Sequence, residues 1–252
     1  MTLQEALFKY TIRRADDTLI LGHRLSEWCG HGPVLEEDIA LTNLALDLIG
    51  QSTVFFQYAA KVENKGRTED DLAFLRIERE YKNILLVEQP NGDFGKTIVR
   101  QFFFDHFQKL LFEQLLESKD KQLAAIAAKS LKEVKYHLKH SSEWVIRLGD
   151  GTEESHNRVQ ESVTDLARFI GELFYQDEVD ELLIKEGIVP NTADFRKEYD
   201  KNIKAVLDEA TLQLPEKNWQ LDGGRKGVHS EHLGFLLTEL QYMQRTYPGM
   251  EW

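Results

Sequence analysis

Residues 39–56, IALTNLALDLIGQSTVFF, are apolar on nearly every side of a helix and decide the fold. They belong to a longer helix predicted over about residues 35–62. A helix that is apolar nearly all round is usually buried at the centre of a structure. Asn43, Asp47 and Gln51 form one polar line through it. We therefore predict an all-α protein built around this helix.

Helical spacing of apolar residues continues along most of the chain, and the strand signal is weak. The predicted helices cover about residues 3–28, 35–62, 70–87, 97–117, 121–148, 153–176, 177–185, 194–212 and 230–245. The five prolines lie near predicted helix ends, where they are tolerated. We predict a helical bundle forming a single domain over residues 1–252. Its core bundle spans about 3–176, and a helical C-terminal extension spans about 177–252.

Composition excludes several classes of function. The formal net charge of −12 repels nucleic-acid phosphates and anionic lipid. Cys29 is the only cysteine, which excludes an intrachain disulfide and suits a reducing compartment. The N-terminus is too charged for a signal peptide, and no run approaches the roughly 20 apolar residues that span a membrane. We expect a cytoplasmic protein with no nucleic-acid or membrane partner.

Several predicted helices carry an acidic residue that could point inward, as in a bundle that holds two metal ions. The candidate residues are Asp47, Asp105, Glu133 and His137. Glu133 and His137 lie four residues apart and so share a helix face. One interpretation is a metal site. The other is a set of buried polar groups that pair with one another, because buried charges persist only when paired, or else solvated helix faces.

The sequence does not supply the full set of ligands that a di-metal site needs. Di-iron carboxylate bundles take a Glu from each of two helices and a Glu-x-x-His from each of two others. That pair occurs once, at Glu153 to His156, where a first-turn Glu also suits the helix dipole, so we prefer a structural interpretation. Where a ligand-bearing helix is expected the sequence reads Asp47-Leu-Ile-Gly50, and glycine has no side chain to bind iron. This pattern favours a partner subunit over a lone enzyme.

Four phenylalanines on the predicted helix 97–117 suggest a contact surface. They are Phe102, Phe103, Phe104 and Phe107. Three successive residues spread over roughly 200° of a helix, so a single neighbour cannot cover them all. We predict that at least one of these rings faces a partner.

The C-terminal region carries two weaker signals. The stretch 222–227, DGGRKG, lacks the spacing of a P-loop or a dinucleotide fingerprint, and we interpret it as a mobile loop. His229 and His232 follow it, and we interpret them as the polar start of the last helix.

Five long blocks of sequence carry a resemblance to a known family. They are residues 21–33 (LGHRLSEWCGHGP), 45–51 (ALDLIGQ), 86–94 (LVEQPNGDF), 147–156 (RLGDGTEESH) and 229–237 (HSEHLGFLL). With these blocks the chain resembles PaaC, the family of structural subunits of the bacterial ring phenylacetyl-CoA epoxidase. The resemblance extends over nearly the whole chain and is far more specific than any metal motif.

The resemblance implies a ferritin-like fold and a role in phenylacetate degradation. It implies a heteromer with a similar catalytic subunit, which carries the di-iron centre and binds the CoA thioester. With a reductase, that oxidoreductase complex inserts one oxygen atom of O2 into the aromatic ring. This chain would then be non-catalytic, without a cofactor of its own, and would also self-associate through the complex.

Two alternatives stay open. One is an autonomous ferritin-like di-metal oxidase or iron store that uses Asp47, Asp105, Glu133 and His137. The other is a scaffold for a different acyl-CoA monooxygenase.

Overall fold

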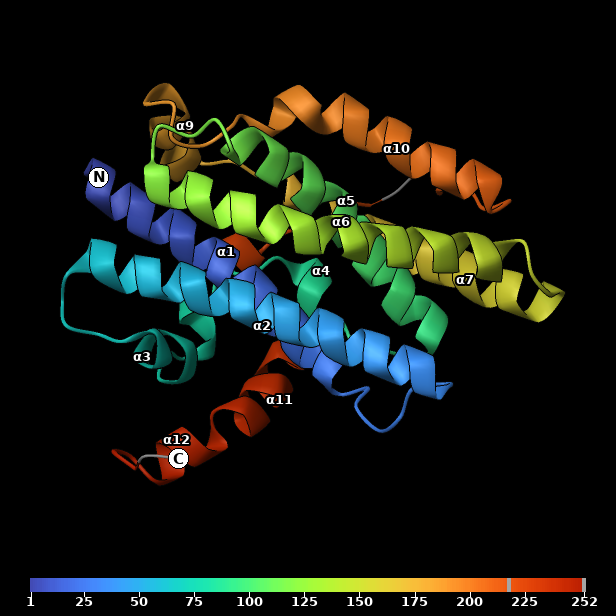
Figure 1. Ribbon diagram of the computed structural model, residues 1–252, viewed down its shortest axis with the longest axis horizontal. Coiled ribbons are helices and arrows are strands. Elements are labelled where there is room, and N and C mark those ends of the chain that lie inside the picture. The colour runs from blue at the N-terminus through green and yellow to red at the C-terminus, as the bar shows by residue number, and fades with distance from the viewer. Residues whose placement is uncertain (217–218, 251–252) are drawn as a thin grey trace. The chain divides into compact units, whose positions relative to one another are not determined.

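The computed structural model describes residues 1–216 and 219–250, and no strand occurs in these ranges (Figure 1). The predicted all-α class is confirmed. The chain forms two compact units, residues 1–90 with 223–252 (the first unit) and residues 91–222 (the second unit). The predicted extension is divided between them, and its residues 217–218 and 251–252 lie outside the described ranges. That all of this forms one domain stays a prediction.

The first unit is built on two long antiparallel helices that lie side by side (Figure 1). Its elements are α1 (Leu3–Ser26), α2 (Leu35–Glu63), α3 (Glu69–Phe74), η1 (Glu78–Glu80), α4 (Leu85–Glu88), η4 (Gly224–Lys226), α11 (Glu231–Leu240) and α12 (Tyr242–Thr246). A Cβ at Gly22 would lie 3.0 Å from the Ile49 side chain, so glycine lets α1 and α2 approach closely. Ser52 of α2 also donates to the Ala15 carbonyl at 3.1 Å.

The predicted helix over 70–87 is wrong, because this segment breaks into α3, η1 and α4. The backbone is extended between η1 and α4, and two of its amides donate to carboxylates of α1. The Lys82 amide donates to Asp16 at 2.8 Å, and the Ile84 amide donates to Asp17 at 2.9 Å. These bonds replace helical ones, and they come from a part of the chain more than 60 residues away.

The second unit packs around α5, which is buried along most of its length. Its elements are α5 (Phe94–Leu115), α6 (Lys121–Gly149), α7 (Glu153–Leu166), η2 (Ala167–Phe169), α8 (Ile170–Leu173), α9 (Glu178–Lys185), η3 (Thr192–Phe195) and α10 (Arg196–Glu209). Helices α6, α7, α8 and α10 all contact α5. The predicted helix 153–176 is interrupted at η2, where the chain tightens before α8.

Helix α2 alone among the described helices is long and apolar enough to cross a membrane. This criterion concerns length and composition, and a core helix of a soluble protein meets it as well. In α2, 44% of the apolar window is buried within the structure. The absence of a membrane span therefore stays a prediction.

Candidate functional site

A small polar cluster lies between α5 and α6 in the second unit. Its centre is Asp105, which is fully buried. Gln101 donates to one carboxylate oxygen at 2.6 Å, and Ser141 donates to the other at 2.8 Å. His137, one turn before Ser141 on α6, is fully buried as well. Each helix thus supplies two polar residues at a spacing of four, which places them on one face.

Burial determines the protonation of this cluster. It raises the pKa of Asp105 to about 7, because a carboxylate loses its hydration inside the unit. The charge of His137 and the hydrogen bond from Ser141 act in the opposite direction without cancelling this effect. The Asp105 carboxyl group therefore binds a proton more readily than an exposed one, and two uncharged donors hold it in place.

This cluster does not fit a pair of metal ions. A di-iron site of this bundle type needs four carboxylates and two imidazoles, whereas Asp105 is the only carboxylate that the cluster holds. Within residues 1–216 and 219–250, no group of three or more His, Cys, Asp or Glu side chains is arranged to hold a metal ion. Both oxygens of Asp105 already accept hydrogen bonds, so this carboxyl group is satisfied within the chain.

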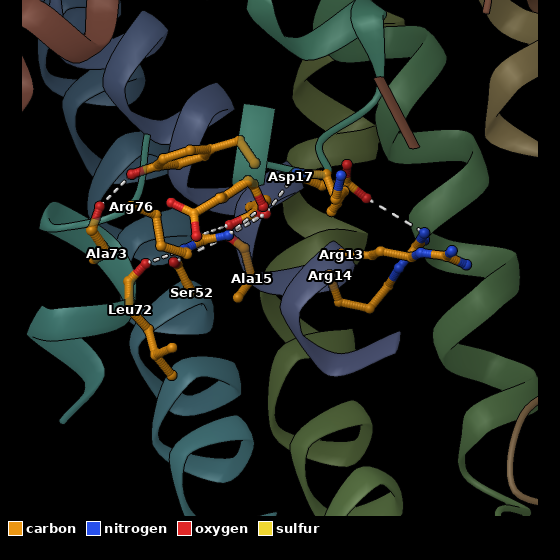
Figure 2. Close-up of polar contacts among 12 residues, drawn as sticks. Arg13, Arg14, Ala15, Asp17, Ser52, Leu72, Ala73 and Arg76 are labelled. Atoms are coloured by element: carbon orange, nitrogen blue, oxygen red, sulfur yellow. Dashed lines mark hydrogen bonds and ion pairs between the residues drawn. The ribbon is translucent and has the colours of Figure 1, made fainter. Parts of the chain in front are cut away.

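The first unit holds its own buried polar groups, and these are charged. Arg76 donates to Asp16 through Nη1 at 3.0 Å, and its Nη2 contacts the other carboxylate oxygen. Burial opposes the charge of Arg76, but Asp16 more than offsets this and raises the pKa of the guanidinium. Figure 2 shows Arg76 reaching the main chain at Leu72 and Asp17 facing Arg14. The second carboxylate, Asp17, accepts two hydrogen bonds from Arg225, at 2.9 and 2.7 Å.

A third charged pair joins α4 to the start of α11. Glu88 is fully buried and accepts from Asn83 at 2.8 Å and from the Ser230 amide at 2.6 Å. The same carboxylate lies 2.8 Å from Nδ1 of His229, whose Nε2 lies 3.0 Å from the Tyr81 carbonyl. A carbonyl only accepts, so Nε2 carries a proton. Burial alone would lower the pKa of His229, but Glu88 offsets it and raises that pKa.

The glycine-rich loop before α11 positions Arg225 beside Asp17. A Cβ at Gly224 would lie 2.0 Å from the Asn83 carbonyl, so only glycine permits this approach. Arg225 follows directly and is buried against Asp17. Residues 222–227, interpreted from the sequence as a mobile loop, pack against residues 79–84. The arginine binds a carboxylate of the chain itself.

The family described as "Phenylacetic acid catabolic protein" matches residues 2–252. The chain belongs to this family. It is also 49% identical over 246 residues to the subunit designated C of the 1,2-phenylacetyl-CoA epoxidase of Escherichia coli (strain K12). The aligned region covers 98% of this chain and 99% of that relative.

In this member of the family the four candidate residues do not share one environment. Asp105 and His137 are buried and belong to the polar cluster. Asp47 and Glu133 are half-buried, so the interpretation of the candidates as a set of buried polar groups is wrong for these two. Glu133 lies at the edge of the apolar stripe of α6, and Asp47 lies beside the exposed face of α2. That Asp47 and Glu133 pair with other polar groups of the candidate set stays an interpretation.

The contacts of the Glu-x-x-His pair agree with the structural interpretation. Thr152 caps α7 by accepting from the Ser155 amide at 3.2 Å, and Glu153 is exposed in the first turn. His156 Nδ1 lies 2.7 Å from the Gly149 carbonyl and so ties the end of α6 to the start of α7. No ligand role is needed to explain either side chain.

The prediction that one of the four phenylalanines faces a partner is wrong. Phe102, Phe103, Phe104 and Phe107 are each at most 3% exposed. Several elements cover them together: Phe107 packs edge-on against Phe174 and also contacts Phe195. Exposed apolar side chains gather elsewhere, on the outer side of α2 and on the C-terminal helices. On the latter they include Phe235, Tyr242 and Met243.

Sequence reasoning missed Gln101 and Ser141 as members of the cluster. The signal for Ser141 was present, because it is a polar residue within the apolar stripe of α6. It also missed Arg76 and Arg225, whose buried charges have no local pattern. Their partners, Asp16 and Asp17, lie far away in the chain.

Proposed function

We propose that this chain is a structural, non-catalytic subunit of a phenylacetyl-CoA epoxidase of aerobic phenylacetate catabolism. The observation that carries the proposal is its 49% identity, over nearly the full length of both chains, to one of the subunits of such an enzyme. In this proposal a catalytic subunit of the complex holds the di-iron centre and binds the CoA thioester. The present chain pairs with that subunit and stabilises it.

The state of the polar cluster supports the non-catalytic role. A metal ligand must offer an ionised carboxylate with a free lone pair toward the ion. Burial raises the pKa of Asp105 to about 7, and each of its oxygens already accepts a hydrogen bond, one from Gln101 and one from Ser141. The cluster therefore keeps the interior of the second unit filled and hydrogen-bonded, and the oxygen chemistry belongs to the partner.

A role in a complex is supported by the surface of the chain. Large apolar side chains are exposed on α2, α11 and α12, and patches of this kind mark protein–protein contacts. Aromatic residues and methionine, as on α11 and α12, are enriched in such contacts. We also propose a cytoplasmic location, which suits the free, exposed Cys29.

Reconstitution tests the proposal directly. Purified separately, this chain should neither oxidise phenylacetyl-CoA with reductase and O2 nor contain stoichiometric iron. Adding the catalytic subunit should give a stable complex and turnover, and omitting this chain should abolish both. About two irons per chain, with turnover by the isolated chain, would instead establish the autonomous di-metal oxidase.

A variant pair sharpens the same test. Asp105→Asn and His137→Gln preserve size and should leave turnover of the assembled complex within about twofold, because neither residue touches the reacting atoms. A loss of about a hundredfold or more, from an otherwise stable complex, would place a metal ligand in this chain and refute the non-catalytic assignment.

A further inference from the structure

Helix α6 concentrates positive charge in a chain that is acidic as a whole. It contains five lysines and one arginine against two glutamates, so its formal net charge is +4, whereas that of the whole chain is −12. Each of the other described α-helices carries +1 at most. A positive element in a negative chain creates a local field that attracts anionic partners to one place.

Most lysines of α6 lie along one exposed line of side chains, called here the α6 face. It consists of Lys121, Ala125, Ala128, Lys132, Lys135 and Lys139, spaced by three or four residues. Residues at this spacing share one side of a helix, and the line is about 27 Å long. All six residues are exposed, whereas the opposite side of α6 is buried. No acidic residue interrupts the line.

The charge of the α6 face is only weakly neutralised by the chain itself. Lys132 forms no ion pair with any residue that the structure describes. Lys135 Nζ lies 4.0 Å from Glu113, and the lysine side chain stays 55% exposed. Lys139 Nζ lies 3.8 Å from Glu143, and that lysine stays 71% exposed. Exposed pairs of this kind contribute little, so the face keeps its positive potential.

We propose that the α6 face is the docking surface for an acidic protein that binds reversibly, namely the reductase of the proposed complex. An acidic patch on the reductase meets the ammonium groups of Lys132, Lys135 and Lys139. The inference rests on the proposed function and deepens it, because it assigns one component of the complex to one surface of this chain.

The composition of the α6 face favours a transient partner over a permanent subunit. Stable interfaces have aromatic-rich centres and are depleted of lysine. The α6 face offers only lysine and alanine, so a permanent partner would have to remove water from several strongly hydrated ammonium groups. Electron-transfer encounters bury little surface, and complementary charge speeds their association and fixes their orientation. A reductase that arrives and leaves repeatedly suits such a surface.

Charge also limits the class of partner. Nucleic acid is a polyanion, but it extends beyond a line of about 27 Å and would meet the negative charge of the rest of the chain. A compact protein with one acidic patch meets only the α6 face. Tyr136 lies beside this line and is 52% exposed, and it offers an aromatic contact of the kind that is enriched in protein interfaces.

Turnover of the reconstituted complex, measured against the concentration of reductase, tests the proposal. Lys132→Glu combined with Lys139→Glu should raise the reductase concentration at half-maximal rate about tenfold in about 50 mM salt, because both changes repel an acidic patch. The maximal rate should stay within about twofold, since saturating reductase still reaches the surface. In about 0.5 M salt the difference from wild type should shrink to about twofold, because salt screens exposed charges.

The matched control is Lys197→Glu combined with Lys204→Glu on α10. These lysines are exposed and have the same spacing, and Lys204 pairs with Asp208 as Lys139 pairs with Glu143. Helix α10 carries no net charge, so the same change should leave the half-maximal concentration within about twofold of wild type. Circular dichroism and size-exclusion chromatography should show both double variants folded and bound to the catalytic subunit.

Surface plasmon resonance of the reductase on the isolated chain tests the α6 face without the catalytic subunit. The dissociation constant of wild type should rise steeply with salt. In about 50 mM salt the α6 double variant should bind the reductase about tenfold more weakly than the α10 double variant does.

Four results would overturn the proposal: equal behaviour of the two double variants, an effect of the α6 variant that does not shrink with salt, loss of the catalytic subunit from that variant, or binding of a nucleic-acid duplex to the face in place of the reductase. If turnover is normal but insensitive to the α6 variant, only the docking surface is wrong. If the wild-type chain supports no turnover with the catalytic subunit and the reductase, the proposed function itself fails.

Discussion

Both units bury polar groups, but they do so with different chemistry. In the first unit the groups are full charges, as in the pair of Asp17 and Arg225, and they join parts of the chain 208 residues apart. In the second unit Asp105 is held by neutral donors on α5 and α6, at separations of 4 and 36 residues. The buried ion pairs thus hold segments together that are distant in the sequence. The polar cluster around Asp105 instead fills the space between two helices that already pack against each other.

This difference in buried groups follows from the interactions that stabilise each unit. Helices α5 and α6 have large apolar surfaces, and packing alone brings them together. The segment 76–90 and the C-terminal segment have short helices that are not stable alone. These segments are held on α1 by side chains that accept hydrogen bonds from backbone amides outside the helices. Asp16 does so for the amide of residue 82, and Asp17 for the amide of residue 84.

The largest expected effect comes from breaking a charged pair in the first unit. Asp17→Ala leaves Arg225 buried without its carboxylate and should cost about 3–5 kcal/mol of unfolding free energy. The midpoint of thermal unfolding should fall by about 10 °C. The double variant Asp17→Ala with Arg225→Met should lose less than the two single variants added together, as read by urea unfolding. Additive losses would show that the two side chains do not act as a pair.

In the second unit, the contribution of the Asp105 cluster to the unfolding free energy should depend on pH. Because its pKa is raised to about 7, Asp105 binds a proton more readily in the folded than in the unfolded chain. The unfolding free energy should therefore fall as pH rises from about 4 to about 8, by about 3–4 kcal/mol at this site. Asp105→Asn should remove that part of the slope and be more stable than wild type at pH 8.

Urea unfolding at several pH values measures this slope. Asp200→Asn, an exposed carboxylate on α10, serves as the matched control and should keep the wild-type slope. If Asp105→Asn also keeps the wild-type slope, Asp105 is ionised in the folded chain. The two units would then not differ in whether their buried groups are charged.

Sequence alone predicted the long helices well and the short segments poorly. Helices α1, α2 and α6 were placed to within two residues, because apolar periodicity and end signals are local. The segment around Arg76 was predicted as one helix because its amphipathic pattern is helical. Its actual path depends on Asp16 and Asp17, and no local pattern shows which distant carboxylate will accept an amide.

The candidate site was predicted in part for the same reason. Asp105 and His137 were identified because an acid or an imidazole near an apolar helix face stands out. Their partners, Gln101 and Ser141, are small or neutral and look ordinary in sequence. The phenylalanines of α5 were misjudged because only one neighbouring helix was considered, whereas α6, α7, α8 and α10 surround α5.

A smaller effect should come from His229 in the first unit. His229→Gln removes the charged hydrogen bond to Glu88 and should cost about 1.5–3 kcal/mol at pH 6. Since the pKa of His229 is raised in the folded chain, the pair is fully present below about pH 6.5 and weakens as pH rises through the raised value. The difference between wild type and variant should thus shrink by pH 9. The control His31→Gln, at an exposed position, should show no such trend.

The smallest effect, and one of opposite sign, is expected at Gly50. Gly50→Ala should stabilise the dilute monomer by about 0.5–1 kcal/mol, because alanine restricts the unfolded chain and meets no neighbour in the folded one. Gly22→Ala on α1 should instead destabilise, since its Cβ would press on Ile49 at 3.0 Å. Thermal unfolding at low protein concentration measures both. A loss of stability in Gly50→Ala would mean that the outer side of α2 is packed within the chain, so that the first unit is held by more than its inner charges.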